Sequence, residues 1–137
     1  MPKNINGVAA WHPGLMPGIC LDSSLRENPV LHKCVMAHEI GHIITADGNA
    51  IPRISTSYHH RCVATKVEHC GKAWTARYLL PYRELREVML SGCCEVWELQ
   101  EHFEVTKEVV WGRLNMADGL NLKNEFMRKQ KELIKYG

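Results

Sequence analysis

The sequence predicts an α+β fold that is mostly helical, with a short antiparallel sheet near the N-terminus. Two short apolar runs, Val8 to Trp11 and Ile19 to Leu21, are separated by His-Pro-Gly and Pro-Gly, a pattern typical of two strands with a turn-rich connection. From Asn28 onward the apolar residues recur at helical spacing instead. A chain of 137 residues has the length of one domain, so we expect residues 1–137 to form a single domain with 95–137 as a packed helical subregion.

The helices are expected to begin and end at residues that favour such boundaries. Asn28 followed by Pro29 predicts the start of the first helix, because asparagine is a good N-cap and proline is tolerated at the first helical position. Asp47-Gly48 predicts its end, and residues 48–61 are expected to form a loop with at most one strand. The later expected helices are Val63–Leu80, Pro81–Ser91, Glu95–Phe103, Thr106–Asn115 and Leu122–Tyr136.

The last two expected helices are separated by Asp118-Gly119, a dipeptide typical of turns. The final helix alternates charges of both signs, which indicates a solvated amphipathic helix. We expect its apolar side chains to pack against the body of the protein: Leu122, Phe126, Leu133 and Ile134.

Composition excludes several classes of partner and location. The formal net charge of +2 is too small to favour binding to nucleic acid or to an anionic membrane. No apolar run approaches the roughly 20 residues that span a bilayer, and residues 1–14 lack the apolar segment of a signal peptide. We therefore expect a cytoplasmic protein whose thiols stay free in a reducing environment, several of them buried. Without a C-x-x-C pair, a structural zinc site made of cysteines is disfavoured: Cys20, Cys34, Cys62, Cys70, Cys93 and Cys94.

The chemistry is concentrated in the segment MAHEIGHIITADG. Residues four apart project from one face of a helix on successive turns, so His38 and His42 can bind one zinc ion. Glu39 is rotated by roughly 100° from His38 and is placed to act as the general base of a hydrolysis rather than as a ligand. Gly41 is expected to let this helix pack closely on the sheet. The pattern therefore predicts a zinc peptidase, although manganese or cobalt would accept the same ligands.

A catalytic zinc needs a third protein ligand. Glu68 is favoured because it falls in the first turns of the next helix, which can pack antiparallel to the motif helix. Its neighbour His69 points away by about a third of a turn and is a competitor. The full set of candidates is His59, His60, Glu68, His69 and, more distantly, His102. A side chain that stabilises the oxyanion is also expected, and the choice among Tyr58, His59 and His60 is open.

Three segments together resemble the ImmA/IrrE metallopeptidase family. The first is HEIGH at 38–42, and the second, E-H-C-G-K-A-W-T-A-R-Y-L-L-P at 68–81, is similar to the family pattern E-x-x-A-N-x-F-A-x-x-L-L-M-P. Glu68 takes the place of the family's third zinc ligand, whereas Gly71 and Lys72 depart from the Ala-Asn pair. The third segment, ELQEHFEVTKEVVWGRL at 98–114, is similar to L-x-x-x-F-x-V-S-x-x-x-V-x-x-R-L. The matching positions are Trp74, Thr75, Leu79, Leu80, Pro81, Leu99, Phe103, Val105, Thr106, Val110, Arg113 and Leu114.

The resemblance implies a zincin-like domain that cleaves a protein or peptide substrate. It implies an edge strand beside the active site, for which Gly18–Asp22 is the candidate, and a DNA-binding repressor of a phage or mobile element as the substrate. Two alternatives are a metal-containing helix-turn-helix regulator built on residues 98–114 and an anti-repressor that binds without cutting. The expected second helix offers only Lys107, Arg113 and Asn115 for DNA contacts, and Val109, Val110 and Trp111 make it look core-facing.

Overall fold

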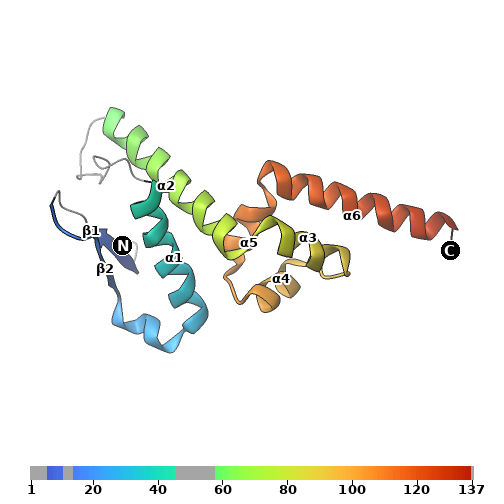
Figure 1. Cartoon of the computed structure of the whole chain (residues 1–137), viewed down its shortest axis with the longest axis horizontal. Helices are drawn as coiled ribbons and strands as arrows, with labels where there is room; N and C mark the ends of the chain where they lie inside the picture. Colours follow the sequence, from blue (N-terminus) through green and yellow to red (C-terminus); the bar gives the residue numbers. More distant parts are fainter. Residues whose placement is uncertain (1–5, 11–13, 46–57, 137) are drawn as a thin grey trace. The chain divides into compact units, whose positions relative to one another are not determined.

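The computed structural model describes residues 6–10, 14–45 and 58–136 and confirms the predicted α+β class. The described residues form six α-helices and a two-stranded antiparallel sheet near the N-terminus (Figure 1). The chain divides into two compact units, Met1–Thr75 and Ala76–Gly137. The organisation as a single domain stays a prediction, and each unit is described by itself below.

The sheet of the first unit pairs β1 (Gly7–Ala10) with β2 (Gly18–Leu21), close to the two predicted strands. The register places Gly7 opposite Leu21, and both strands pack against the first helix. A Cβ atom on Gly7 would lie 2.9 Å from both Leu21 Cδ2 and Val35 Cγ1. Glycine at this position therefore allows the strand to lie close to the helix. Trp11, the predicted end of the first strand, lies outside the described residues.

Helix α1 (Pro29–Thr45) begins where the sequence predicts. The side-chain oxygen of Asn28 accepts a hydrogen bond from the backbone N–H of Leu31 at 3.1 Å, which confirms Asn28 as its N-cap. A short 3-10 helix, η1 (Ser23–Glu27), precedes α1 and was not predicted. The predicted helix end at Asp47-Gly48 lies outside the described residues.

Helix α2 (Tyr58–Leu79) begins earlier than predicted. The expected loop over residues 48–61 is therefore wrong for residues 58–61, which are helical. No proline or glycine interrupts residues 58–65, so nothing in the local sequence stops the helix from extending in that direction. At the other end, Pro81 disfavours helical backbone at the residue before it, in agreement with the break at Leu79.

The second unit contains α3 (Tyr82–Leu90), α4 (Val96–Phe103), α5 (Lys107–Leu114) and α6 (Ala117–Tyr136). Helix α5 contacts both α4 and α6, and α3 contacts α6. The carboxylate of Glu98 accepts a hydrogen bond from the backbone N–H of Glu95 at 3.0 Å, which caps α4. The core of this unit is apolar: Leu80, Leu85, Met89, Leu99, Val105, Val110, Leu114 and Leu122.

Helix α6 begins at Ala117, so the predicted break at Asp118-Gly119 is wrong. Both residues belong to the first turn of the helix, where an acidic side chain is favourable. A Cβ atom on Gly119 would lie 2.5 Å from the backbone oxygen of Arg113 and 2.9 Å from Leu114 Cα. The glycine is thus required by the close approach of α6 to the end of α5, rather than by a turn.

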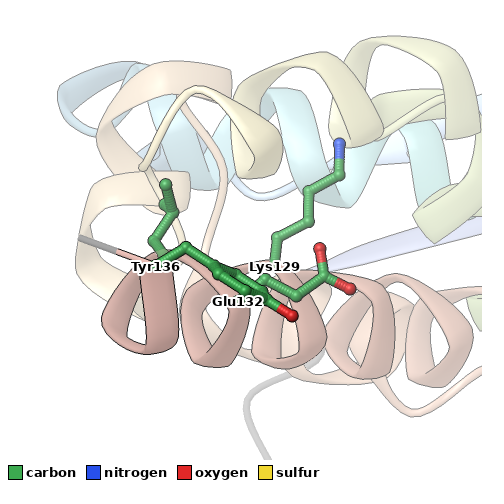
Figure 2. Close-up of a pocket in the computed structure, with 4 residues that line it drawn as sticks. Lys129, Glu132 and Tyr136 are labelled. Carbon is green, nitrogen blue, oxygen red and sulfur yellow. The ribbon is translucent and has the colours of Figure 1, made fainter.

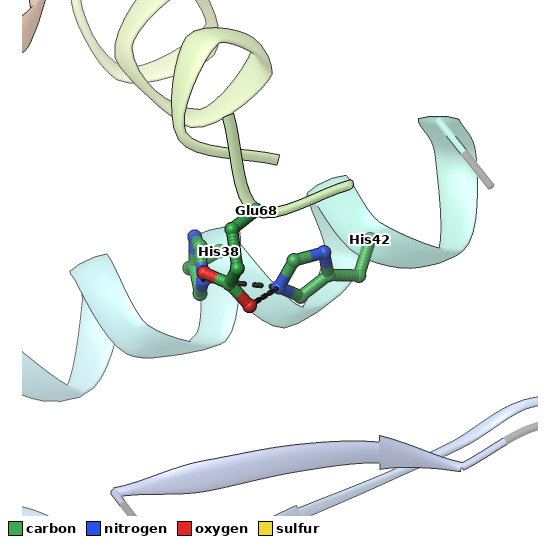
Figure 3. Close-up of side chains that lie close together, drawn as sticks. All are labelled: His38, His42 and Glu68. Atoms are coloured by element: carbon green, nitrogen blue, oxygen red, sulfur yellow. Dashed lines mark hydrogen bonds and ion pairs between the residues drawn. The ribbon is translucent and has the colours of Figure 1, made fainter. Parts of the chain in front are cut away.

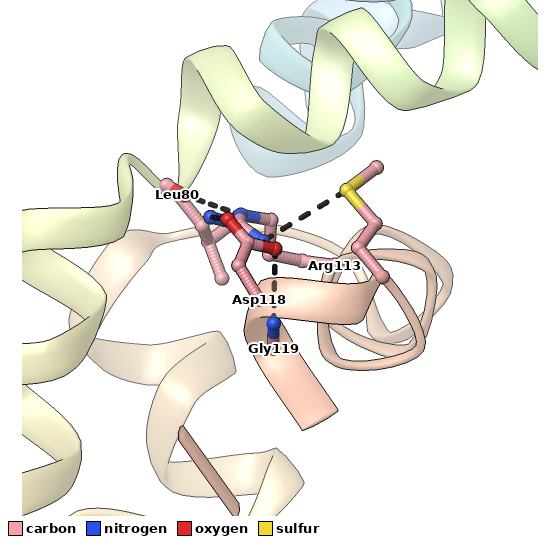
Figure 4. A network of polar contacts seen from close by, with 5 residues as sticks. Leu80, Arg113, Asp118 and Gly119 are labelled. Carbon is pink, nitrogen blue, oxygen red and sulfur yellow. Dashed lines mark hydrogen bonds and ion pairs between the residues drawn. The ribbon is translucent and has the colours of Figure 1, made fainter. Parts of the chain in front are cut away.

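A buried arginine joins the end of α2 to α5 and α6 (Figure 4). Arg113, which is 1% exposed, donates from Nε to the backbone oxygen of Leu80 at 2.8 Å. Its two terminal nitrogens donate to the carboxylate of Asp118 at 2.6 and 2.9 Å. These hydrogen bonds hold the pKa of Asp118 below its ordinary value. The bidentate pair therefore compensates for the burial of the guanidinium.

The C-terminal half of α6 is not packed as predicted. Leu122 is buried and Phe126 is half-buried, whereas Leu133 and Ile134 are 73% and 82% exposed. The last turns of α6 extend past α3, so no neighbouring helix of this unit covers them (Figure 1). A pocket of about 480 Å³ is present here and contains none of the predicted site residues (Figure 2). Its lining residues are Lys129, Glu132, Leu133 and Tyr136.

Replacing Asp118 tests whether the Arg113 pair stabilises the second unit. We expect Asp118→Ala to lower the free energy of unfolding by about 2 kcal/mol at pH 7, a value that allows for partial solvent screening of this half-exposed carboxylate. The pKa of Asp118 is depressed, so its contribution is present above the ordinary pKa of 3.8 and is lost as the pH falls through the lower folded value. Urea unfolding at pH 7 and below pH 3 measures this difference, with the exposed Glu101→Ala as the control. Equal effects of the two substitutions at pH 7 would contradict the assignment.

Candidate metal centre

Helix α1 presents His38 and His42 on the same side of successive turns, as predicted. Their Nε2 atoms lie 3.0 Å apart, and their ring centroids are separated by 4.4 Å. Both side chains are largely buried, with 24% and 16% of their surface exposed. The two imidazoles therefore direct their outer nitrogens at the same point in space.

Helix α2 brings the carboxylate of Glu68 to this point (Figure 3). Its Oε2 atom lies 3.2 Å from His38 Nε2, and its Oε1 atom lies 3.0 Å from His42 Nε2. Ligand atoms about 2.0–2.1 Å from a tetrahedral ion are about 3.3 Å from one another. The three side chains are therefore spaced as the ligands of one small cation. Among the residues that the structure describes, these three form the group of histidine, cysteine or acidic side chains whose ligand atoms lie close enough together to hold a metal ion.

The electrostatics of the cluster favour a neutral His38. Burial of the ring lowers the pKa of His38, and the nearby His42 lowers it further. The carboxylates of Glu68 and Glu39 act in the opposite direction without cancelling the effect. A neutral imidazole keeps the lone pair that a metal ion needs, so protons compete less with a metal at this residue than at an ordinary histidine.

Glu39 lies beside the cluster without belonging to it. The residue is 6% exposed, and its Cγ atom would be 3.2 Å from a Cβ atom on Gly7 of β1. Its side chain is therefore placed between α1 and the sheet, whereas the two histidines face α2. Its effect on the pKa of His38 shows that its charge still acts on the cluster. Glu39 is thus separated from the two histidines, and its role as general base stays a prediction.

The other predicted candidates are not brought to the cluster within the described residues. His69 is exposed and lies outside the group of three, although it follows Glu68 directly. His102 is exposed on α4 in the second unit, where its ring contacts Phe103 edge-on. Helix α2 includes Tyr58, His59 and His60, but their side chains lie outside the described part of the chain. The identity of an oxyanion-stabilising residue stays open.

Two glycines, Gly41 and Gly71, lie at the contact between α1 and α2, which the sequence alone did not predict. Gly41 was expected to face the sheet, but a Cβ atom there would lie 3.0 Å from the backbone oxygen of Gly71 and 3.0 Å from a ring carbon of Trp74, both on α2. In the sequence, Gly71 stood out because the similar family pattern has alanine at this position. What it contacts could not be inferred before the helix crossing was known.

The described cysteines take no part in the cluster. Cys20, Cys34, Cys70, Cys93 and Cys94 have free thiols, and Cys62 lies outside the residues whose side chains are described. Only Cys34 among these five is buried, whereas the sequence suggested that several would be. None of the five belongs to the group of potential metal ligands.

The burial of Arg113 weakens the helix-turn-helix alternative. Arg113, one of the three residues available for DNA contacts, is buried and bound to Asp118. Trp111, expected to face the core, is instead 52% exposed, and the Lys107 ammonium lies 5.6 Å from the centre of its ring. Of the three residues expected to contact DNA, only Lys107 and Asn115 are therefore left to bind in a DNA groove.

Replacing the cluster residues one at a time tests whether they bind a metal together. Loss of an outer-shell partner costs about 10–100-fold in metal affinity, so loss of a ligand should cost more than about 100-fold. We expect His42→Ala and Glu68→Ala each to show this loss in a competition titration with a chromophoric chelator. The exposed His69→Ala is the matched control and should bind as the wild type does. Retained affinity in Glu68→Ala together with lost affinity in His69→Ala would show that the neighbouring residue is the ligand.

Comparison with known proteins identifies the family of this chain. The family model described as IrrE N-terminal-like domain (Peptidase_M78) matches residues 1–115. Searches of the curated proteins and of the solved structures each found no match. Within the described residues, no helix is both long and apolar enough to cross a membrane. The matched region includes both α1 and Glu68, and the chain belongs to the ImmA/IrrE family of metallopeptidases.

Proposed function

We propose that the protein is a zinc-dependent endopeptidase whose metal ligands are His38, His42 and Glu68. The convergence of these three side chains in a member of a metallopeptidase family is the observation that carries the proposal. Two histidines and one glutamate form a ligand set of catalytic zinc sites, in which the fourth position remains open. Imidazole and carboxylate ligands at this spacing also accept manganese or cobalt, but four-coordinate geometry favours zinc.

The residues present fit such an ion. The donor atoms are spaced for tetrahedral coordination, and the lowered pKa of His38 keeps one of the imidazoles ready to bind. Zinc at this site would act as a Lewis acid that makes water more acidic and polarises the carbonyl group of a peptide bond. The 51% exposure of the Glu68 side chain leaves the cluster accessible from solvent.

Glu39 is assigned the role of general base. It lies next to His38 in sequence, on the side of α1 that faces β1, and its buried carboxylate is held away from the ligand positions. From there it would take a proton from the attacking water and later transfer it to the nitrogen of the leaving amine. The hydrolysis needs no covalent intermediate with the protein.

The substrate is proposed to be a polypeptide that adds as a strand to the sheet. Strand β2 has β1 on one side, and among the described residues no strand pairs with its other edge. Its side chains alternate, with Gly18 and Cys20 exposed and Ile19 and Leu21 half-buried. Such an edge offers backbone hydrogen bonds to a peptide. Following the family resemblance, we propose that the substrate is a DNA-binding repressor of a phage or mobile element and that cleavage takes place in the cytoplasm.

Replacing the proposed base separates a peptidase from an anti-repressor that only binds. We expect Glu39→Gln to retain the metal and to lower the cleavage rate at least about 100-fold, because general base catalysis contributes about 10²–10⁴-fold. Turnover of a fluorogenic peptide library and metal content by elemental analysis measure the two properties. Glu27→Gln, which changes an exposed carboxylate of the same unit, is the control.

Full turnover by Glu39→Gln would remove Glu39 from the mechanism. A wild-type protein that holds one metal ion per chain yet cleaves neither the library nor a purified repressor would favour the binding protein instead.

A further inference from the structure

Helices α1 and α2 touch through backbone atoms at the metal centre. Both glycines of this contact, Gly41 and Gly71, are buried. A Cβ atom on Gly41 would lie 3.0 Å from the Gly71 backbone oxygen and 3.3 Å from Thr75 Oγ1. A side chain on Gly41 would therefore require these neighbours on α2 to shift.

Gly71 faces the ring of a proposed metal ligand directly. A Cβ atom on Gly71 would lie 2.8 Å from both Cε1 and Nδ1 of His42, and 3.5 Å from Cγ. Real Cβ atoms essentially never approach another heavy atom within 3.0 Å. Alanine could be accommodated only if the imidazole ring moved or the helices separated.

The Nε2 atom of His42 faces His38 and Glu68, but the opposite ring nitrogen has no such contact within the described residues. This atom, Nδ1, is buried and has no hydrogen-bond partner among the described residues. Histidines that bind metals usually donate their second ring N–H to a carboxylate, a carbonyl or a water molecule, and this contact fixes the orientation of the ring. On this side of the His42 ring lies the bare backbone of Gly71.

We infer that Gly71 is a positioning residue, whose lack of a side chain forms the seat that aims His42 Nε2 at the metal position. The inference rests on the proposed metal centre. Gly71 follows Glu68 by three residues, so both lie on the same face of α2. One turn of α2 thus supplies a ligand and also the surface against which another ligand packs. Within the described part of the chain, packing against Gly71 takes the place of the hydrogen bond that orients the ring in most such sites.

Metal affinity and the Co²⁺ spectrum test this role in the whole chain. We expect Gly71→Ala to weaken Co²⁺ binding about 10–100-fold and to alter the visible absorption of the bound ion, because the ring is displaced. The control is Gly112→Ala on α5, where an added Cβ would meet nothing within 4 Å. Gly112→Ala should raise the apo-protein's melting temperature, since alanine is the better helix former, and leave the Co²⁺ spectrum unchanged.

A double-mutant cycle in the apo protein shows which atoms Gly71→Ala displaces. Gly71→Ala should lower the melting temperature by about 4 °C when His42 is present and should not lower it in the His42→Ala background, where the ring is gone. This background also keeps the test valid if Gly71→Ala alone fails to fold. Equal destabilisation in both backgrounds would mean that the added methyl group strikes the α1 backbone instead, which would overturn the inference.

The metal titration distinguishes the two possible failures. If the wild type binds Co²⁺ and Gly71→Ala has the same affinity and spectrum, the positioning role of Gly71 is overturned and the proposed function stands. Absence of Co²⁺ binding by the wild type would overturn the proposed function and this inference together.

Discussion

The proposed metal centre depends on how closely α1 and α2 approach each other. Two of the proposed ligands come from α1 and the third from α2, so the distance between these helices sets whether Glu68 can reach both histidines. That approach is possible because Gly41 and Gly71 bring backbone against backbone at the crossing. Thr75 donates from Oγ1 to the backbone oxygen of Gly71 at 2.8 Å, which provides a partner for this buried carbonyl. Glycine at the crossing makes the helices less stable in isolation but allows the three ligands to meet.

A glycine also permits close packing on the other side of α1. Gly7 of β1 lies against Val35 and Glu39, so the sheet also approaches the helix through a residue without a side chain. Glu39 is therefore enclosed between the helix and the sheet, while His38 and His42 project toward α2. The helix thus separates a carboxylate suited to proton transfer from the residues suited to binding a metal. In the second unit, Gly119 has a comparable position where α6 meets the end of α5.

Much of the fold and of the cluster could be predicted because the relevant signals are local. His38 and His42 share one helix, so their spacing alone places both on one face, and Asn28 marks the start of that helix. Glu68 was favoured from its place in the next helix and from the family resemblance, because its position depends on how a second helix packs. The start of α6 was missed because Asp118-Gly119 is typical of turns. In the structure Asp118 pairs with Arg113 and Gly119 lies against the end of α5, contacts that the dipeptide itself does not reveal.

Side-chain burial was harder to predict than helix position. The apolar residues near the end of α6 suggested a packed face, yet Leu133 and Ile134 are exposed because the helix extends past its neighbours. Trp111 likewise looked like a core residue and lies at the surface, whereas the charged Arg113 is buried. Hydrophobicity indicates which side chains can be buried, but only the arrangement of neighbouring helices decides which of them are.

The most direct measurement of the central claim is anomalous diffraction at the zinc absorption edge from crystals of the whole chain grown with zinc. The account predicts one strong peak about 2.0–2.2 Å from Nε2 of His38, Nε2 of His42 and a carboxylate oxygen of Glu68. A map with no peak between these side chains at saturating zinc, or with the ion bound by other residues, would contradict it.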